Sequence, residues 1–172
     1  MRQFAAFNVK RWLEENRHLL KPPVGNRVLA DGEFKVMVVA GPNERTDYHV
    51  ENHEEIFYQL EGDLILKFVD ESEEPPRFDE VHVGGGELFA LPARVPHSPQ
   101  RLPGSIGLVV ERERDATELD RLRWYCQQCR SVMYEESFHC ADLTKDLLPV
   151  IQRYRADQAH RTCKQCGWVE HV

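Results

Sequence analysis

Apolar and polar residues alternate with a period of about two through the middle of the chain, whereas the N-terminal part has a different spacing. Within residues 8–23 the apolar positions Val9, Trp12, Leu13 and Leu20 lie close to helical spacing, and two consecutive prolines end the pattern. The sequence therefore predicts a short amphipathic helix that covers part of the core, followed by a region built from strands.

The region from residue 27 to residue 114 is patterned as a series of short strands. An Asp-Gly pair at residues 31 and 32 separates the first two apolar runs, which is a strong local signal for a hairpin. Six further runs follow without a helical segment of about ten residues between them; they are residues 47–51, 54–60, 63–69, 78–83, 87–92 and 105–114. About eight strands separated by turn residues predict a mainly β fold, an antiparallel barrel or jelly roll.

The pattern changes after Arg114. Residues 142–158 have helical spacing, with Pro149 expected to disturb the helix, and a pair of cysteines lies on either side of this segment. The length of 172 residues fits one main domain with a small appendage. We therefore divide the chain into residues 1–115, a barrel with its N-terminal helix, and residues 116–172, a C-terminal extension with a helical tail.

The net charge narrows the classes of function. The chain has 22 lysine and arginine residues against 29 aspartate and glutamate residues, which gives a formal charge of −7. This excess disfavours binding to nucleic acid or to an anionic membrane. The N-terminal segment has charges within a few residues of any apolar run, so it predicts neither a secretory signal nor a membrane span. We expect a cytoplasmic protein whose five cysteines stay reduced.

Two histidines and a glutamate stand near the predicted ends of strands. His49 ends one strand and Glu55 begins the next, so both side chains can project into the same mouth of the barrel. His97 lies just past a strand and a proline, in a predicted loop from which it can supply a third ligand. Two imidazoles and one carboxylate make a facial triad, which is associated with non-haem Fe(II) and dioxygen because it leaves coordination positions open.

Other polar residues are weaker candidates for metal ligands. His53 lies in the middle of the loop that precedes Glu55 and is expected to be a solvated histidine, and Glu51 becomes a ligand only in a different loop geometry. The remaining histidines have no paired partner in the sequence, and we assign no role to His18, His82, His139, His160 and His171.

Charged residues near the predicted triad favour an anionic substrate. Arg45 precedes the first histidine of the triad by four residues and Arg101 follows the last by four, and an arginine fork can bind a carboxylate through two hydrogen bonds. In the strand that ends near residue 113, small residues share one face with Glu111, so that face can leave room for a ligand in the lumen. The alternative, an exposed glutamate on an edge strand, stays open at this point.

Two motifs carry a resemblance to a known superfamily. The stretch HVENHEE with Gly62 after it, and the stretch from Gly86 to His97, resemble the paired metal motifs of the cupins. Most cupins have a second histidine two residues after the first, and here Glu51 takes that place. The 3-hydroxyanthranilate 3,4-dioxygenase family shows the same departure, and the likeness to that family covers both cysteine pairs and residues 21–27, 41–49, 54–62, 95–101 and 109–114.

This resemblance implies a cupin-type barrel that holds Fe(II) through His49, Glu55 and His97. It implies an extradiol-type dioxygenase that opens the ring of 3-hydroxyanthranilate with O2. The product would be 2-amino-3-carboxymuconate semialdehyde, the precursor of quinolinate in the kynurenine pathway, which serves NAD biosynthesis or tryptophan catabolism. The resemblance also implies the residues around the reactants, which are Arg101, Glu111 and Glu55 for the aromatic acid and Arg45, Asn26 and Asp47 on the dioxygen side.

The C-terminal extension carries two Cys-x-x-Cys motifs separated by 33 residues, formed by Cys126, Cys129, Cys163 and Cys166. Four thiolates at this spacing suit a tetrahedral Zn or a single Fe, and the long insert resembles a rubredoxin-like site. Unligated thiols or two disulfides are the disfavoured alternative in a reducing compartment. Acidic residues dilute the basic ones in this segment, so we expect a structural clip rather than a nucleic-acid-binding module. Cys140 is expected to be a small buried residue.

Two other classes of function remain as alternatives. One is a different metal-dependent cupin reaction on a small anionic aromatic compound, such as a decarboxylation or an isomerisation, which the missing second histidine disfavours. The other is a non-enzymatic cupin that senses a small molecule, which an intact triad with two arginines beside it disfavours. The strand 63–69 has apolar residues on both faces, and this favours packing against a second copy of the chain in a homodimer.

Overall fold

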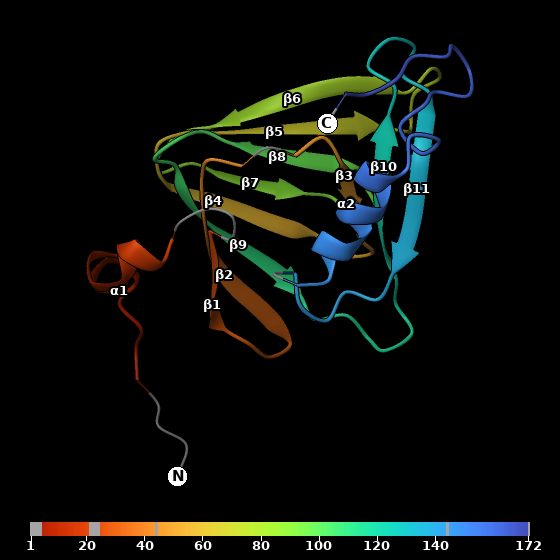
Figure 1. Cartoon of the computed structure of the whole chain (residues 1–172). Coiled ribbons are helices and arrows are strands. Elements are labelled where there is room, and N and C mark those ends of the chain that lie inside the picture. Colours follow the sequence, from red (N-terminus) through yellow and green to blue (C-terminus); the bar gives the residue numbers. More distant parts are fainter. Residues whose placement is uncertain (1–4, 21–24, 44, 144, 172) are drawn as a thin grey trace.

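Strands outnumber helices in the structure (Figure 1), a computed structural model that describes residues 5–20, 25–43, 45–143 and 145–171. The predicted N-terminal helix is present and is capped by the side chain of Asn8, which accepts a hydrogen bond from the backbone N–H of Arg11 at 2.9 Å. The two prolines expected to end it lie outside the described residues. The elements are α1 Val9–Asn16, the short 3-10 helix η1 Arg17–Leu19, β1 Asn26–Ala30, β2 Phe34–Ala40, β3 Tyr48–Val50, β4 Glu55–Glu61, β5 Leu64–Asp70, β6 Arg77–Val83, β7 Leu88–Leu91, β8 His97–Arg101, β9 Ile106–Arg112, β10 Asp120–Tyr125, β11 Val132–Phe138 and α2 Leu147–Ala156.

The strands form two antiparallel sheets. One has five strands in the order β1-β2-β9-β4-β7, and the other has six in the order β11-β10-β3-β8-β5-β6. Sheet neighbours are often distant in the sequence, since β9 lies between β2 and β4 and β8 lies between β3 and β5. This arrangement is the mainly β, cupin-type jelly roll that the alternation and the resemblance predict.

Two strands beyond residue 115 were missed by the sequence analysis. In β10, Asp120, Leu122 and Trp124 are buried and alternate with arginines and a tyrosine, which is strand periodicity with charged residues on the outer face. β10 pairs with β3 on one side and with β11 on the other. The segment after residue 115 therefore extends the same sheet that carries β3.

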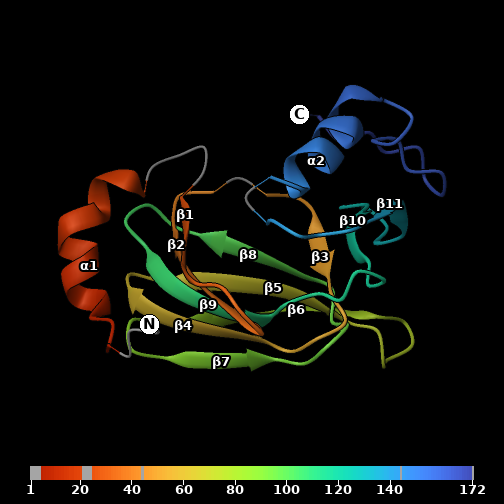
Figure 2. The same ribbon diagram turned by 90° about the horizontal axis from the view of Figure 1, so that it is seen from below.

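The core has three parts, of which one lies inside the barrel and another lies beneath α1. Inside the barrel, buried apolar residues from both sheets meet, among them Met37, Phe57, Leu64, Leu66 and Leu91. On the outer face of the five-stranded sheet, α1 buries Leu13 against a patch of the sheet that includes Val38 and Ile106. Figure 2 shows α1 and α2 on opposite sides of the body of strands. α1 therefore covers a different part of the barrel from α2.

The C-terminal helix is shorter than predicted. It spans Leu147–Ala156, and Pro149 is its third residue. The backbone nitrogen at this position has no partner within a helix, so a proline there disturbs nothing. α2 packs against the six-stranded sheet through Tyr154, whose ring stacks on that of Trp124 with centroids 4.1 Å apart. This packing fixes the helix beside β10.

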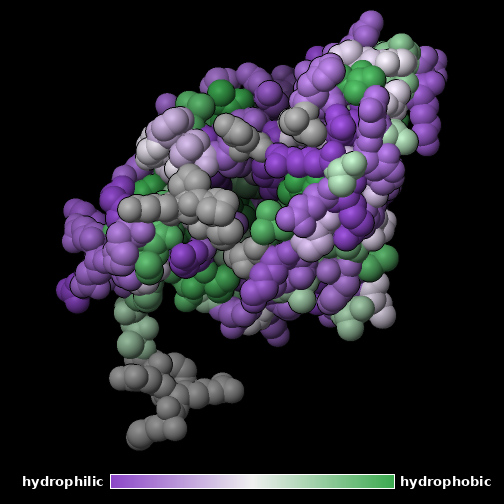
Figure 3. Space-filling model, viewed as in Figure 1, coloured by the Kyte–Doolittle hydropathy of each residue, from purple (hydrophilic) through white to green (hydrophobic). Residues whose placement is uncertain are grey.

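Hydrophilic side chains dominate the face shown in Figure 3, with smaller hydrophobic groups between them. Among the described residues, no helix is long and apolar enough to cross a membrane.

Candidate active site

Three strands bring the predicted triad together. His49 lies in the middle of β3, and His97 is directly opposite it as the first residue of β8, so this histidine lies in a strand rather than in the expected loop. Glu55 begins β4 in the other sheet. One ligand atom from each residue lies within 4.8 Å of the other two, and all three residues are buried. The two sheets thus supply two imidazoles and one carboxylate to a single point inside the barrel.

The protonation states around this point favour a cation. Nδ1 of His97 lies 3.0 Å from the carbonyl oxygen of Val95, which can only accept, so this nitrogen carries the proton and Nε2 keeps a lone pair in the neutral ring. Nε2 lies 2.7 Å from Oε2 of Glu55. Burial acts to raise the pKa of Glu55, but positive charge on the imidazoles of His97 and His49, which a bound metal ion would replace, lowers it to about 2. An ionised carboxylate and imidazole lone pairs converging in a buried space fit a divalent metal ion.

The other residues considered as ligands are bonded to side chains outside the triad. The ring of His53 is partly buried and bonds Glu118 at 3.1 Å, so it is not a free loop histidine and does not belong to the triad. Glu51 is buried and bonds Arg114, although its carboxylate lies within ligand distance of Glu55 and Glu111.

A cavity of about 550 Å³ opens beside the triad, a volume in the usual range for a small-molecule site. Its wall includes residues that the sequence analysis named, which are Asn26, Arg45, His49, Glu55, His97, Arg101 and Glu111. Asp47 is not part of the wall but bonds Arg45, with Nε of the arginine 3.1 Å from Oδ2. The predicted metal and substrate residues therefore share one cavity.

Arg101 is a buried cation without a matching anion. Its side-chain hydrogen bond to Oε1 of Gln59 is long, at 3.5 Å, and no carboxylate of the described residues forms an ion pair with it. Burial lowers its pKa to about 10. Gly107 makes room for this side chain, because a Cβ at that position would lie 2.9 Å from Nη1 of Arg101. The small residues of β9 do face the lumen, as the alternation predicts.

Glu111 belongs to a buried ionic cluster that the sequence analysis did not find. It is not on an edge strand, because β9 lies between β2 and β4, and it is only 1% exposed. Arg114 donates to Glu111, to Glu51 and to Asp120. Burial and the charge of Glu55 raise the pKa of Glu111 to about 8 and that of Glu51 to about 10. Without a bound metal ion, burial therefore favours the protonated forms of Glu51 and Glu111.

The helix α2 forms part of the cavity wall, although the sequence analysis assigned it to the tail. Leu147, Ile151 and Arg155 lie at intervals of four residues, which places them on one face of the helix, and all three line the cavity together with Leu143 and Leu148. The signal in the sequence was the helical spacing itself, but nothing in it showed which part of the barrel the helix covers.

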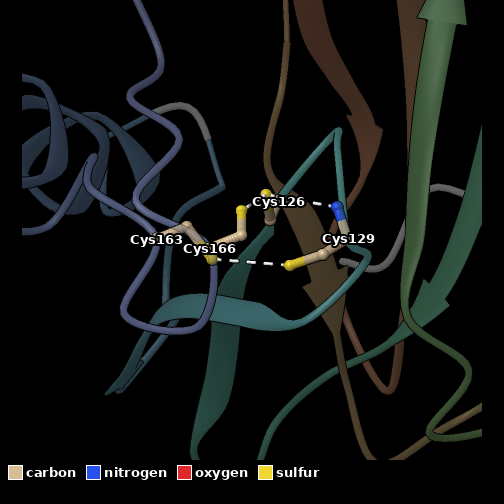
Figure 4. A group of neighbouring side chains, drawn as sticks. All are labelled: Cys126, Cys129, Cys163 and Cys166. Atoms are coloured by element: carbon tan, nitrogen blue, oxygen red, sulfur yellow. Dashed lines mark hydrogen bonds between the residues drawn. The ribbon is translucent and has the colours of Figure 1, made fainter.

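The four cysteines of the two Cys-x-x-Cys motifs converge from two segments (Figure 4). Sγ of Cys126 lies 3.6 Å from that of Cys166, and Sγ of Cys129 lies 3.5 Å from that of Cys163. Two sulfurs of a tetrahedral site with bonds of about 2.3 Å are separated by about 3.8 Å, whereas a disulfide needs about 2.05 Å. The geometry fits a metal ion and excludes these disulfides. Cys140 is buried, as expected.

Comparisons with known proteins agree with this geometry. A family model described as 3-hydroxyanthranilic acid dioxygenase matches residues 1–155. The chain is 50% identical over 160 residues to the 3-hydroxyanthranilate 3,4-dioxygenase of Xanthomonas euvesicatoria pv. vesicatoria, covering 93% of this chain and 89% of that one. It is 46% identical over 164 residues to the protein of the same name from Scheffersomyces stipitis, covering 95% and 94%. A solved structure from Neisseria meningitidis aligns with a TM-score of 0.50 and 18% identity over 63% of this chain and 100% of that one, which supports the fold alone.

Proposed function

Because the chain belongs to the 3-hydroxyanthranilic acid dioxygenase family, we propose that it opens the aromatic ring of 3-hydroxyanthranilate with O2. The product is 2-amino-3-carboxymuconate semialdehyde, the precursor of quinolinate in the kynurenine pathway. The observation that carries the proposal is the convergence of His49, Glu55 and His97 in the cavity that also contains Arg101 and Glu111. The triad fits a divalent metal ion, and the cavity with Arg101 beside it fits an anionic aromatic acid.

His49, Glu55 and His97 would hold Fe(II), which suits two imidazoles and a carboxylate. When bound, the metal would act as a Lewis acid toward the hydroxyl and amino groups of the substrate and would supply the redox chemistry that a reaction with O2 needs. All three residues are at most 5% exposed, so protein atoms surround most of the metal position.

Arg101 provides the anchor for the substrate carboxylate. Its guanidinium is a buried cation that lines the cavity and lacks an ionic partner among the described residues, so a carboxylate can pair with it through two hydrogen bonds. Glu111 lies on the same strand-lined wall, with Oε2 buried and without a hydrogen-bond partner among the described residues. That oxygen is available to the hydroxyl or amino group of the ring, and the two contacts together fix the ring against the triad.

Arg45 and Asn26 line the same cavity, and we assign them to the dioxygen side. Asp47 is 2% exposed and accepts hydrogen bonds from Arg45, so it holds the guanidinium in place. A fixed positive charge at this position favours negative charge that develops as O2 reacts.

The second metal position is a structural site in this proposal. Cys126, Cys129, Cys163 and Cys166 hold Zn or Fe, and the metal joins the turn after β10 to the chain that follows α2. The division at residue 115 stays a prediction; beyond it, α2 lines the cavity and β10 pairs with β3, the strand that carries His49. The protein acts on a small molecule, and a cytoplasmic location, in which the cysteines would stay reduced, remains a prediction from the sequence.

We further propose a homodimer. Ile56, Tyr58 and Leu88 are exposed apolar residues on β4 and β7, where Tyr58 and Leu88 are direct partners. Light scattering should give twice the mass of the chain, and a monomer mass would contradict the proposal. A Leu88→Glu variant tests whether these exposed residues of β4 and β7 form the dimer contact. If they do, the variant should weaken the dimer.

Anaerobic loading with Fe(II), followed by O2 and 3-hydroxyanthranilate, tests the function. Wild type should consume the substrate and the His49→Ala variant should not. Iron bound at the triad without turnover of this substrate would contradict the proposed reaction and leave the metal site intact.

A further inference from the structure

A buried chain of hydrogen bonds leads from His49 to two residues outside the triad. Nε2 of His49 lies 2.7 Å from Oδ2 of Asp120. Arg114 donates to both oxygens of that carboxylate, from Nε at 3.2 Å and from Nη2 at 2.9 Å. Asp120 is 0% exposed and Arg114 is 6% exposed, so water does not compete for these bonds.

The sheet explains why Asp120 reaches this histidine. β10 pairs with β3, and Leu122 lies opposite His49. Asp120 is two residues before Leu122, so both side chains point to the inner face on which His49 lies. β10, a strand of the C-terminal segment, thus places the carboxylate of Asp120 next to His49, a proposed metal ligand.

The hydrogen bonds determine which nitrogen of His49 carries the proton. Arg114 is always charged and donates twice to Asp120, so Asp120 is a carboxylate that can only accept. Nε2 of His49 must then donate, and Nδ1 keeps its lone pair. We propose that Asp120, held by Arg114, is a positioning residue that fixes His49 in the tautomer whose Nδ1 is the metal ligand. Metal-binding histidines commonly donate their other ring N–H to a carboxylate in this way.

The same guanidinium also reaches the substrate side. Nη1 of Arg114 donates to Oε1 of Glu111, and Nη2 donates to Glu51 as well as to Asp120. Arg114 therefore sets the orientation of a metal ligand through Asp120 and of the proposed substrate acceptor directly. A change at Asp120 should weaken the metal alone, whereas a change at Arg114 should weaken both metal and substrate binding.

The inference rests on the proposed metal site, and its first test needs no variant. Wild-type protein labelled with ¹⁵N is loaded with two equivalents of Zn(II), and the imidazole nitrogens of His49 are observed by NMR, assigned by their absence in His49→Gln. We expect a protonated Nε2 and a Zn-bound Nδ1. A Zn-bound Nε2 would overturn the inference, and an absence of Zn(II) from the triad would overturn the metal site itself.

The second test measures affinity. Fe(II) affinity at the triad is determined anaerobically by chelator competition, with the cysteine site kept filled. Asp120→Asn should weaken it about 10- to 100-fold, the usual effect of removing such a partner. Arg114→Lys should weaken it and also raise the dissociation constant for the substrate in the Zn(II)-loaded protein.

A matched control separates positioning from folding. Glu135 lies on β11, next to β10, and accepts a hydrogen bond from Arg123. Glu135→Gln makes the same carboxylate-to-amide change as Asp120→Asn, and it should leave the Fe(II) affinity of the triad unchanged. The metal-free melting temperature of each variant reports any structural loss. Wild-type Fe(II) affinity in a folded Asp120→Asn would overturn the inference even if activity fell.

Discussion

Replacing Arg101 by methionine should weaken substrate binding and stabilise the empty protein at the same time. The side chain is 3% exposed, and its pKa falls from the usual 12.5 to about 10 because burial disfavours the cation. At 1.36 kcal/mol for each pKa unit, holding the charge in the empty cavity costs about 3 kcal/mol below pH 10. Methionine has a similar length and removes that cost.

The two effects have opposite signs and different sizes. A stability gain of a few kcal/mol raises the melting temperature of a chain of this size by about 5 °C, allowing for the lost bond to Gln59. Truncating one partner of a buried charge pair costs about 2–5 kcal/mol, so substrate affinity should fall by about 30-fold to several thousand-fold. Arg101 is thus a residue whose function is maintained at the expense of stability.

Calorimetric titration of the Zn(II)-loaded protein with 3-hydroxyanthranilate, and with 2-aminophenol as the analogue without the carboxylate, separates the contribution of Arg101. The variant should lose affinity for the acid but little for 2-aminophenol. Arg121→Met, which removes a half-exposed arginine of β10, is the control and should change neither affinity. Equal losses for both ligands, or a fall in the melting temperature of Arg101→Met, would refute the reasoning.

Three further predictions follow from the same cavity and its supports. Gly107→Ala places a Cβ 2.7 Å from Gln59 and 2.9 Å from Arg101, so the guanidinium must move and substrate affinity should fall about tenfold by calorimetric titration; an unchanged affinity would show that the arginine tip is free to adapt. Anaerobic Fe(II) affinity at the triad should rise as pH increases from 6 to 8, by up to about tenfold per unit for each proton released. The reason is that the pKa of Glu111 is raised to about 8 and a nearby divalent cation favours its ionised form; Glu111→Gln should flatten the slope, and an equal slope in the variant would exclude Glu111 as the source. Cys163→Ser should lose one metal per chain and lower the melting temperature by at least about 5 °C while the triad still binds Fe(II); metal analysis that finds two ions per chain would contradict the four-cysteine site.

The sequence predicts the barrel well because the relevant signals are local. Short runs rich in aliphatic and aromatic residues mark β2, β4, β5 and β9, and turn residues lie at their ends. His49 and Glu55 are close in sequence, so their convergence can be anticipated from strand ends. The cysteine pairs are equally local motifs, and the structure brings the four sulfurs together.

The parts that were missed depend on contacts between distant segments. β10 carries three charged residues, so its period of two is hidden from a search for apolar runs, and Asp120 was not recognised as the partner of His49, 71 residues earlier. Arg114 gives no local signal because its three carboxylate partners come from three different strands or loops. The position of α2 over the cavity likewise follows from the stacking of Tyr154 on Trp124, which periodicity cannot predict.

The most direct test of the account is stoichiometric turnover by the metal-loaded protein. Metal-free protein is loaded anaerobically with Fe(II), 3-hydroxyanthranilate is added, and O2 uptake and product absorbance are followed after mixing with oxygenated buffer, with His49→Ala as the control. The wild type should consume one O2 for each substrate molecule that it opens, and the control should show neither O2 uptake nor product. Iron bound at the triad with no loss of 3-hydroxyanthranilate, or equal turnover by His49→Ala, would contradict it.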